Sequence, residues 1–292
     1  LLESHVIGDP TFRFAPVPGS VDVDGLLLQN KASSWKKLLK SPLPDVQSLA
    51  IEQLRRAGAL SSADLLRIYR ESPYGVVRLE ALMALSATPD NHFITAVTEA
   101  SQDAYELVQR QAIRFIAKNG DRRLIPALIR LSIANNTSDR CNFNVMTALA
   151  CFPKEDLLAE FDRQFDAPSV QYLDKNNLRG KIRNTIAHSA DRLTTDIDKV
   201  VKGEASEKDR TFTIRALRNT LPHHKVPELL VYLQDCGDGN TQILLLEALG
   251  WHTVSCHAAD IAATALKMSE DASLPNTVRQ EALKTYRRIH EK

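Results

Sequence analysis

A short segment near the C-terminal end carries three residue types that bind metal ions or perform catalysis. His252, Cys256 and Asp260 are spaced four residues apart. On one continuous helix they would share a face, and imidazole, thiolate and carboxylate are ligands that zinc accepts. However, we expect a helix to begin near Val254, which places His252 in the preceding turn and disrupts the spacing. We therefore predict no metal site here and interpret these side chains as packing between helices.

Other catalytic and cofactor motifs are missing from the sequence. There is no G-x-S-x-G nucleophile turn, no G-x-x-x-x-G-K-[ST] phosphate loop and no G-x-G-x-x-G fingerprint. The four cysteines form no C-x-x-C pair. The 37 Lys and Arg residues nearly balance the 36 Asp and Glu residues, so no global field attracts nucleic acid or an anionic membrane. We expect no catalytic residue, no cofactor, no small-molecule ligand and no nucleic acid, and any charged site must be local.

The elements that would position such a site are helices. Glycine (11 residues) and aromatic residues (6%) are scarce, which favours helix. The sequence contains no run of 18 apolar residues, which is about the length that a membrane-spanning helix needs. A helical pattern around one small or apolar residue recurs eight times, at steps of 31 to 37 residues. These positions are Ala50, Ala81, Ala112, Val145, Ile182, Thr213, Leu245 and Ala282. A second, shorter helical pattern precedes most copies, so we predict that each copy is a pair of antiparallel helices.

Several copies resemble HEAT repeats, most clearly residues 77–85, 119–131 and 278–283. The short period is similar to that of the phycobilisome-lyase-like HEAT subgroup. The resemblance implies an all-α fold, a right-handed α-α superhelix (a HEAT/armadillo-like solenoid) of about eight helix pairs over residues 33–292. Stacked pairs would bury their apolar stripes in one elongated core, and the second helices would line a concave face. Such a protein is expected to act as a non-catalytic scaffold that binds another protein.

Two sets of basic residues are candidates for contacts. One set occupies the same position in its copies, near the start of the second helix, and forms either a ladder of Arg–Asp contacts between repeats or a ligand ridge. It comprises Arg78, Arg179, Arg210 and Arg279. The other set lies on second helices and would suit an acidic protein partner, although a solvated helix face is the alternative. From it we predict Arg114, Arg183, Arg215 and Arg218 as partner-binding residues, with Arg110 and Lys118 nearby.

We predict that residues 1–32 form an extended lead-in segment, because residues 7–20 carry three prolines and two glycines. Residues 5–14, with Gly8-Asp9-Pro10, resemble the closing strand of gingipain-like, caspase-fold cysteine peptidases. That resemblance implies an alternative function, as the accessory C-terminal region of a larger exported peptidase, in the periplasm or outside the cell. A second alternative is a metal-dependent or lyase-like HEAT enzyme that would use His252, Cys256 and His257. The sequence does not decide the compartment.

Overall fold

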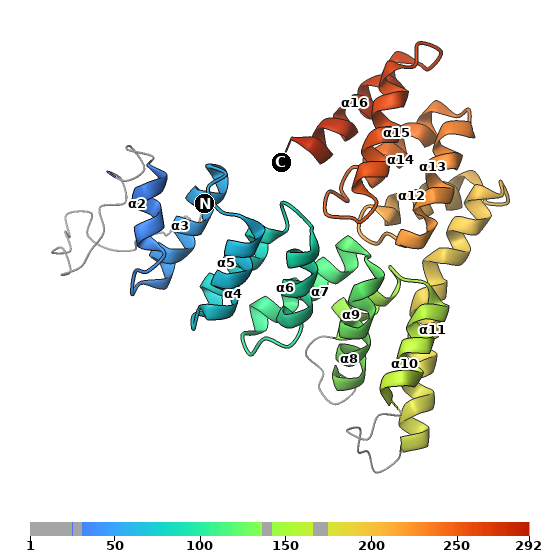
Figure 1. Ribbon diagram of the computed structural model, residues 1–292. Coiled ribbons are helices and arrows are strands. Elements are labelled where there is room, and N and C mark those ends of the chain that lie inside the picture. The colour runs from blue at the N-terminus through green and yellow to red at the C-terminus, as the bar shows by residue number, and fades with distance from the viewer. Residues whose placement is uncertain (1–24, 26–30, 136–141, 166–174, 292) are drawn as a thin grey trace, which may run out of the picture. The chain divides into compact units, whose positions relative to one another are not determined.

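The computed structural model describes residues 25, 31–135, 142–165 and 175–291, and these residues form helices and contain no strand (Figure 1). In the described ranges up to Leu149, the α-helices are α2 (Ala32–Leu38), α3 (Pro44–Arg56), α4 (Ser62–Glu71), α5 (Gly75–Leu85), α6 (Asn91–Ala100), α7 (Glu106–Asn119), α8 (Ile125–Asn135) and α9 (Asn142–Leu149). They are followed by α10 (Lys154–Phe165), α11 (Lys175–Val201), α12 (Glu207–Leu217), α13 (Val226–Asp235), α14 (Gly239–Leu249), α15 (Ala258–Glu270) and α16 (Asn276–His290). Two short 3₁₀ helices, Arg122–Leu124 and His223–Lys225, precede α8 and α13. The prediction of an all-α chain is confirmed.

The chain divides into two compact units, with the boundary between Ala59 and Leu60. The described part of the first unit is the helix pair α2 and α3, which pack against each other and bury Trp35 and Ala50. The predicted lead-in, 1–32, lies almost entirely outside the described residues.

The second unit consists of packed helix pairs. The pairs are α4–α5, α6–α7, α8–α9, α10–α11, α11–α12, α13–α14 and α15–α16. The second helices also contact one another in chain order, from α5 through α7, α9, α11, α12 and α14 to α16. The seven repeat positions on these helices, from Ala81 to Ala282, are all buried. The prediction that these positions lie on packed helix pairs is therefore confirmed. None of the described helices is long and apolar enough to cross a membrane.

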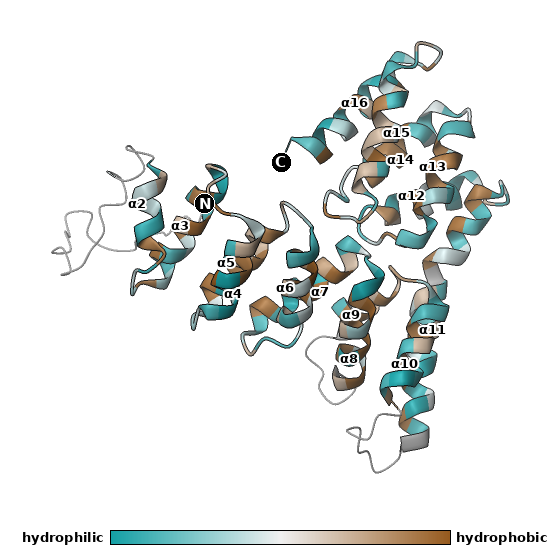
Figure 2. Cartoon of the chain, in the orientation of Figure 1, coloured by the Kyte–Doolittle hydropathy of each residue, from teal (hydrophilic) through white to brown (hydrophobic). Residues whose placement is uncertain are grey.

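Apolar residues concentrate where the pairs meet. Buried side chains between Ile197 and Ile289 form one core cluster that runs through α12, α13, α14, α15 and α16. In Figure 2, α14 is largely brown (hydrophobic) and α10 is mostly teal (hydrophilic). Neighbouring helices bury much of α14, whereas α10 buries one apolar stripe.

Helix α11 departs from the regular pattern. Its 27 residues serve both as the second helix packed on α10 and as the first helix packed on α12. The sequence has neither proline nor glycine between Lys181 and Val201, so nothing breaks the helix at the expected turn.

Two of the recurrent arginines join neighbouring pairs. Arg78 of α5 forms a partly buried ion pair with Asp103, 2.6 Å away in the turn before α7, and Arg210 lies 3.6 Å from Asp238 before α14. Burial is the largest single influence on Asp103 and would raise its pKa, but the hydrogen bonds and charge of Arg78, together with hydrogen bonds from the Tyr105 backbone and Tyr69, outweigh it and lower the pKa of this carboxyl. Arg179 instead pairs with Asp162 inside its own helix pair. The ladder interpretation therefore accounts for Arg78 and Arg210, but not for Arg179.

Candidate functional site

The C-terminal ends of several second helices meet around a buried histidine. His223 is 2% exposed, and its Nε2 lies 2.8 Å from the carbonyl oxygen of Ala117 at the end of α7. Its backbone N–H donates to the carbonyl of Cys151, after α9, at 3.0 Å. Burial lowers the pKa of His223 to about 3, so the ring is neutral at pH 7. A carbonyl only accepts, so Nε2 carries the proton and Nδ1 accepts from the Ser255 hydroxyl at 3.0 Å.

The same region joins parts of the second unit that are distant in sequence. Asn119, the last residue of α7, donates its side-chain N–H to the carbonyl of Val254 and accepts from the backbone N–H of Cys256, both at 2.7 Å. A stack in which each pair touches only its neighbours would not bring the third pair to the turn after the seventh. These long-range hydrogen bonds are an unpredicted feature of the fold.

Gly120 allows this close approach. Its φ is +72°, and a Cβ at this position would lie 2.0 Å from the His223 ring. Only glycine combines this backbone conformation with the absence of a side chain.

His252 is held in the same way. It is 4% exposed, follows α14 in a turn, and its Nε2 donates to the carbonyl of Leu217, at the end of α12, over 2.6 Å. Burial lowers the pKa of His252, so it is also neutral. Its Nδ1 is therefore an acceptor, and it is buried without a hydrogen-bond partner among the described residues.

The structure agrees with the prediction that His252, Cys256 and Asp260 do not share one helix face. The next helix begins at Ala258 rather than near Val254, because His252 to His257 form consecutive turns. Within the described ranges, no group of three His, Cys, Asp or Glu side chains is arranged to hold a metal ion. Although Cys256 as a residue is exposed, desolvation of its thiol raises the pKa to about 11, which disfavours the reactive thiolate.

Beside His252, a cavity of about 210 Å³ carries a concentration of positive charge. It is lined by Lys118, Arg218, Asn219, Trp251 and His252. Lys118 comes from the last turn of α7, and Arg218 from the end of α12. The cavity thus brings together two members of the predicted basic set that are 100 residues apart in the sequence.

Trp251 forms one wall of this cavity and is 45% exposed. The guanidinium carbon of Arg218 and that of Arg288, on α16, each lie 4.6 Å from the centre of its ring. Arg288 Nη1 is buried and has no hydrogen-bond partner in the described structure. Cation–π stacking at this distance fixes both arginines and the ring.

The four predicted partner-binding arginines occupy different environments. Arg114 and Arg215 are exposed on α7 and α12, one turn before Lys118 and Arg218, respectively. Arg218 lies 3.7 Å from Glu247 in addition to Trp251.

Arg183 differs from the other three. Its guanidinium lies 2.7 Å from Asp162, which it shares with Arg179. The sequence did not single out Asn219 or Arg288, but Trp251, directly before His252 in the predicted turn, was a usable signal.

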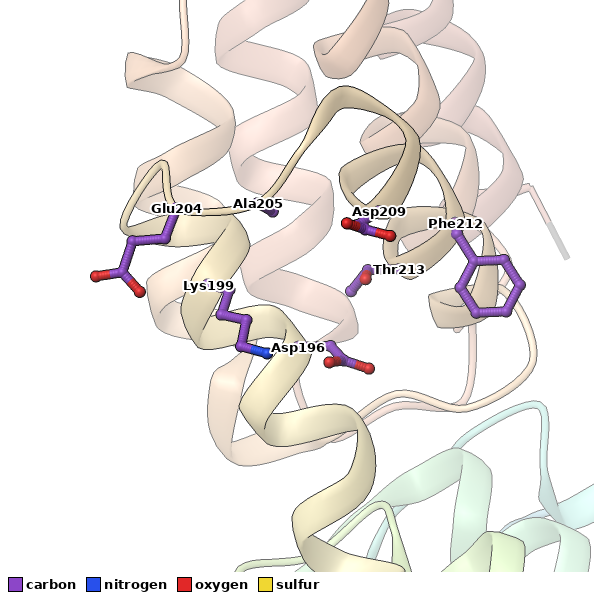
Figure 3. Close-up of a pocket in the computed structure, with 7 residues that line it drawn as sticks. All are labelled: Asp196, Lys199, Glu204, Ala205, Asp209, Phe212 and Thr213. Carbon is purple, nitrogen blue, oxygen red and sulfur yellow. The ribbon is translucent and has the colours of Figure 1, made fainter.

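A larger cavity of about 480 Å³ lies between the end of α11 and the start of α12 (Figure 3). Asp196, Glu204 and Asp209 contribute carboxylates to its wall and Lys199 contributes an amine. Phe212 at its edge is 74% exposed, and in Figure 3 its ring points away from the other labelled side chains. The cavity is acidic, so its charge is opposite to that of the cavity beside Trp251.

The chain matches no protein-family model and no curated protein. The functional argument therefore depends on the geometry and charge of the chain's own residues.

Proposed function

We propose that this protein is a non-catalytic scaffold that binds an acidic segment of a partner protein along its second helices. We infer that the helix pairs form a right-handed, HEAT-like solenoid. The order of contacts along the second helices, and the repeat positions buried on them, support this architecture.

One observation carries the functional proposal: an exposed tryptophan stacked with two arginines beside a cavity lined by further basic residues. Trp and Arg are the residue types that contribute most to binding energy in protein interfaces. Arg114 lies one helical turn before Lys118 on α7, and Arg215 lies one turn before Arg218 on α12, so the basic surface extends beyond the cavity. We call Arg114, Lys118, Arg215 and Arg218 the basic strip. Arg183 would join a contact only by giving up its ion pair with Asp162.

Selection from a displayed library of random 12-residue peptides on the full chain tests the proposal. We expect the selected peptides to be acidic and to lose affinity as salt is raised. The double variant Arg114→Glu, Arg215→Glu should weaken binding of these peptides about tenfold or more, because both residues are exposed and their reversal repels an acidic segment.

The matched control reverses two exposed arginines on first helices, Arg67→Glu and Arg130→Glu, which changes the net charge equally. Circular dichroism should show all three proteins folded. Equal losses in both double variants would reduce the effect to net charge and contradict a specific binding strip, as would selection of peptides with no acidic bias.

A further inference from the structure

We propose that the cavity beside Trp251 is an anchor pocket for one aspartate or glutamate side chain of an extended peptide. This inference rests on the proposed function and deepens it by naming the residue that the partner inserts. It is carried by the juxtaposition of Lys118, Arg218 and Trp251 around a cavity of about 210 Å³.

The local charge favours an anion. Lys118, Arg218 and Arg288 contribute three positive charges, and Glu247, 3.7 Å from Arg218, contributes one negative charge. Lys118 forms no ion pair within the described ranges. A carboxylate in the cavity would meet an ammonium and a guanidinium group, and charge-assisted hydrogen bonds to such groups are about twice as strong as neutral ones.

Helix ends oppose this attraction, and the structure reduces their effect. The C-termini of α7, α12 and α14 carry partial negative charge near the cavity. His223 and His252 already donate to the carbonyls of Ala117 and Leu217 at two of these ends. The alternative role of Lys118 and Arg218 is to stabilise the helix ends without binding a ligand. The experiment below measures binding and stability separately for this reason.

A side-chain carboxylate fits the pocket better than the C-terminal carboxylate of a partner. Chain termini are captured by clusters of free backbone N–H groups. Here the backbone N–H groups of the cavity wall are already bonded to carbonyls three residues earlier, with N···O distances of 3.0 to 3.4 Å. These groups belong to Arg218, Asn219, Trp251 and His252.

The proposed function identifies the occupant as part of a peptide rather than a free anion, because the basic strip continues from the cavity along α7 and α12 through Arg114 and Arg215. His252 also lines the cavity, and its Nδ1 is buried without a hydrogen-bond partner in the described structure.

Tryptophan fluorescence of the full chain reports on this pocket. The chain has two tryptophans, and Trp35 is 1% exposed, so a ligand in the cavity changes the emission of Trp251. The probes are three pentapeptides with acetylated N-termini: Gly-Ser-Asp-Ser-Gly with an amidated C-terminus, its Asn analogue, also amidated, and the Asn analogue with a free C-terminal carboxylate. We expect a saturable change with the Asp peptide, with a dissociation constant on the order of 1 mM, and at least about fivefold weaker binding of either Asn peptide.

Variants connect the signal to the cavity. Lys118→Ala and Arg218→Gln should each weaken binding of the Asp peptide about fivefold or more. Lys208→Ala, which removes an exposed lysine from the first turn of α12, should leave it unchanged. Trp251→Phe should remove the signal, and in that variant calorimetry replaces fluorescence as the binding assay.

Three results would overturn the anchor pocket. They are equal binding of the Asp peptide and the amidated Asn peptide, preference for the free C-terminal carboxylate, and a Lys118→Ala variant that loses thermal stability but binds normally. If library peptides bind through Arg114 and Arg215 while the pentapeptides do not change Trp251 emission, the scaffold proposal stands and the pocket assignment fails. If neither binds, the scaffold proposal fails as well.

Discussion

Replacing Gly120 by alanine tests the long-range junction between the third helix pair and the turn after the seventh. The new methyl group would occupy a position 2.0 Å from the ring of His223, where an ordinary contact needs more than 3.4 Å. The ring would have to move by more than an ångström. Its bonds to the Ala117 carbonyl (2.8 Å) and the Ser255 hydroxyl (3.0 Å) cannot survive that movement.

The expected cost has two parts. Placing alanine at φ +72° costs about 1–2 kcal/mol. Loss of two buried hydrogen bonds adds about 1 kcal/mol each, so the free energy of unfolding should fall by about 3–4 kcal/mol.

Gly203→Ala is the matched control. Gly203 lies in the same unit with a φ of +73°, but a Cβ there would have no heavy atom within 4 Å. It should cost only the backbone part, about 1–2 kcal/mol. Urea unfolding followed by circular dichroism measures both variants, and the difference of about 2 kcal/mol is the contribution of the junction.

A double-mutant cycle completes the test. In a His223→Ala background the clash partner is gone, so Gly120→Ala should cost no more than Gly203→Ala. If Gly120→Ala and Gly203→Ala differ by less than about 0.5 kcal/mol in the wild-type background, the close approach of His223 to α7 is refuted.

Two further predictions concern ionisable groups. Burial holds the pKa of His223 at about 3, below the value of about 6.5 in an unfolded chain. Between these values the unfolded state binds more protons, so stability should fall as pH decreases from 6.5 toward 3, and a His223→Ala variant should show a shallower fall in acid unfolding. Arg78→Leu leaves the buried carboxylate of Asp103 without its ion pair and should lower stability by about 2 kcal/mol. The double variant Arg78→Leu, Asp103→Leu should recover part of that loss, and a double variant as unstable as the single one would contradict the assigned pair.

Local patterns were sufficient to predict the helix pairs because the repeat positions are determined by neighbouring turns of the same helix. Ala81, Ala112 and Ala282 are all fully buried on second helices, as the spacing predicted. The single helix α11 was not predicted, because repeats suggested a break where the sequence has no breaking residue. Both the helix pairs and the single helix α11 are determined by residues within about 30 positions of one another in the chain.

The site could be predicted only in part, because it depends on contacts between residues of different helices and turns. The sequence placed Lys118 and Arg218 in a basic set, but it gave no reason for them to share one cavity. It also gave no sign that Asp162 would engage Arg183, since that carboxylate lies on the preceding helix of the pair. Spacing predicts which residues share a helix face, whereas the turns after the helices decide which faces meet.

The distribution of histidine and basic residues around the junction follows from solvent access. Helix C-terminal carbonyls need donors, and a charged donor is costly where water cannot reach it. At the buried ends of α7 and α12 the donors are neutral imidazoles, from His223 and His252. Where the same helix ends reach the surface, Lys118 and Arg218 supply full charges that water can solvate. The helix ends thus account for basic residues at this place, but they do not account for an exposed tryptophan stacked with two guanidinium groups, and that is why we interpret this surface as a binding site.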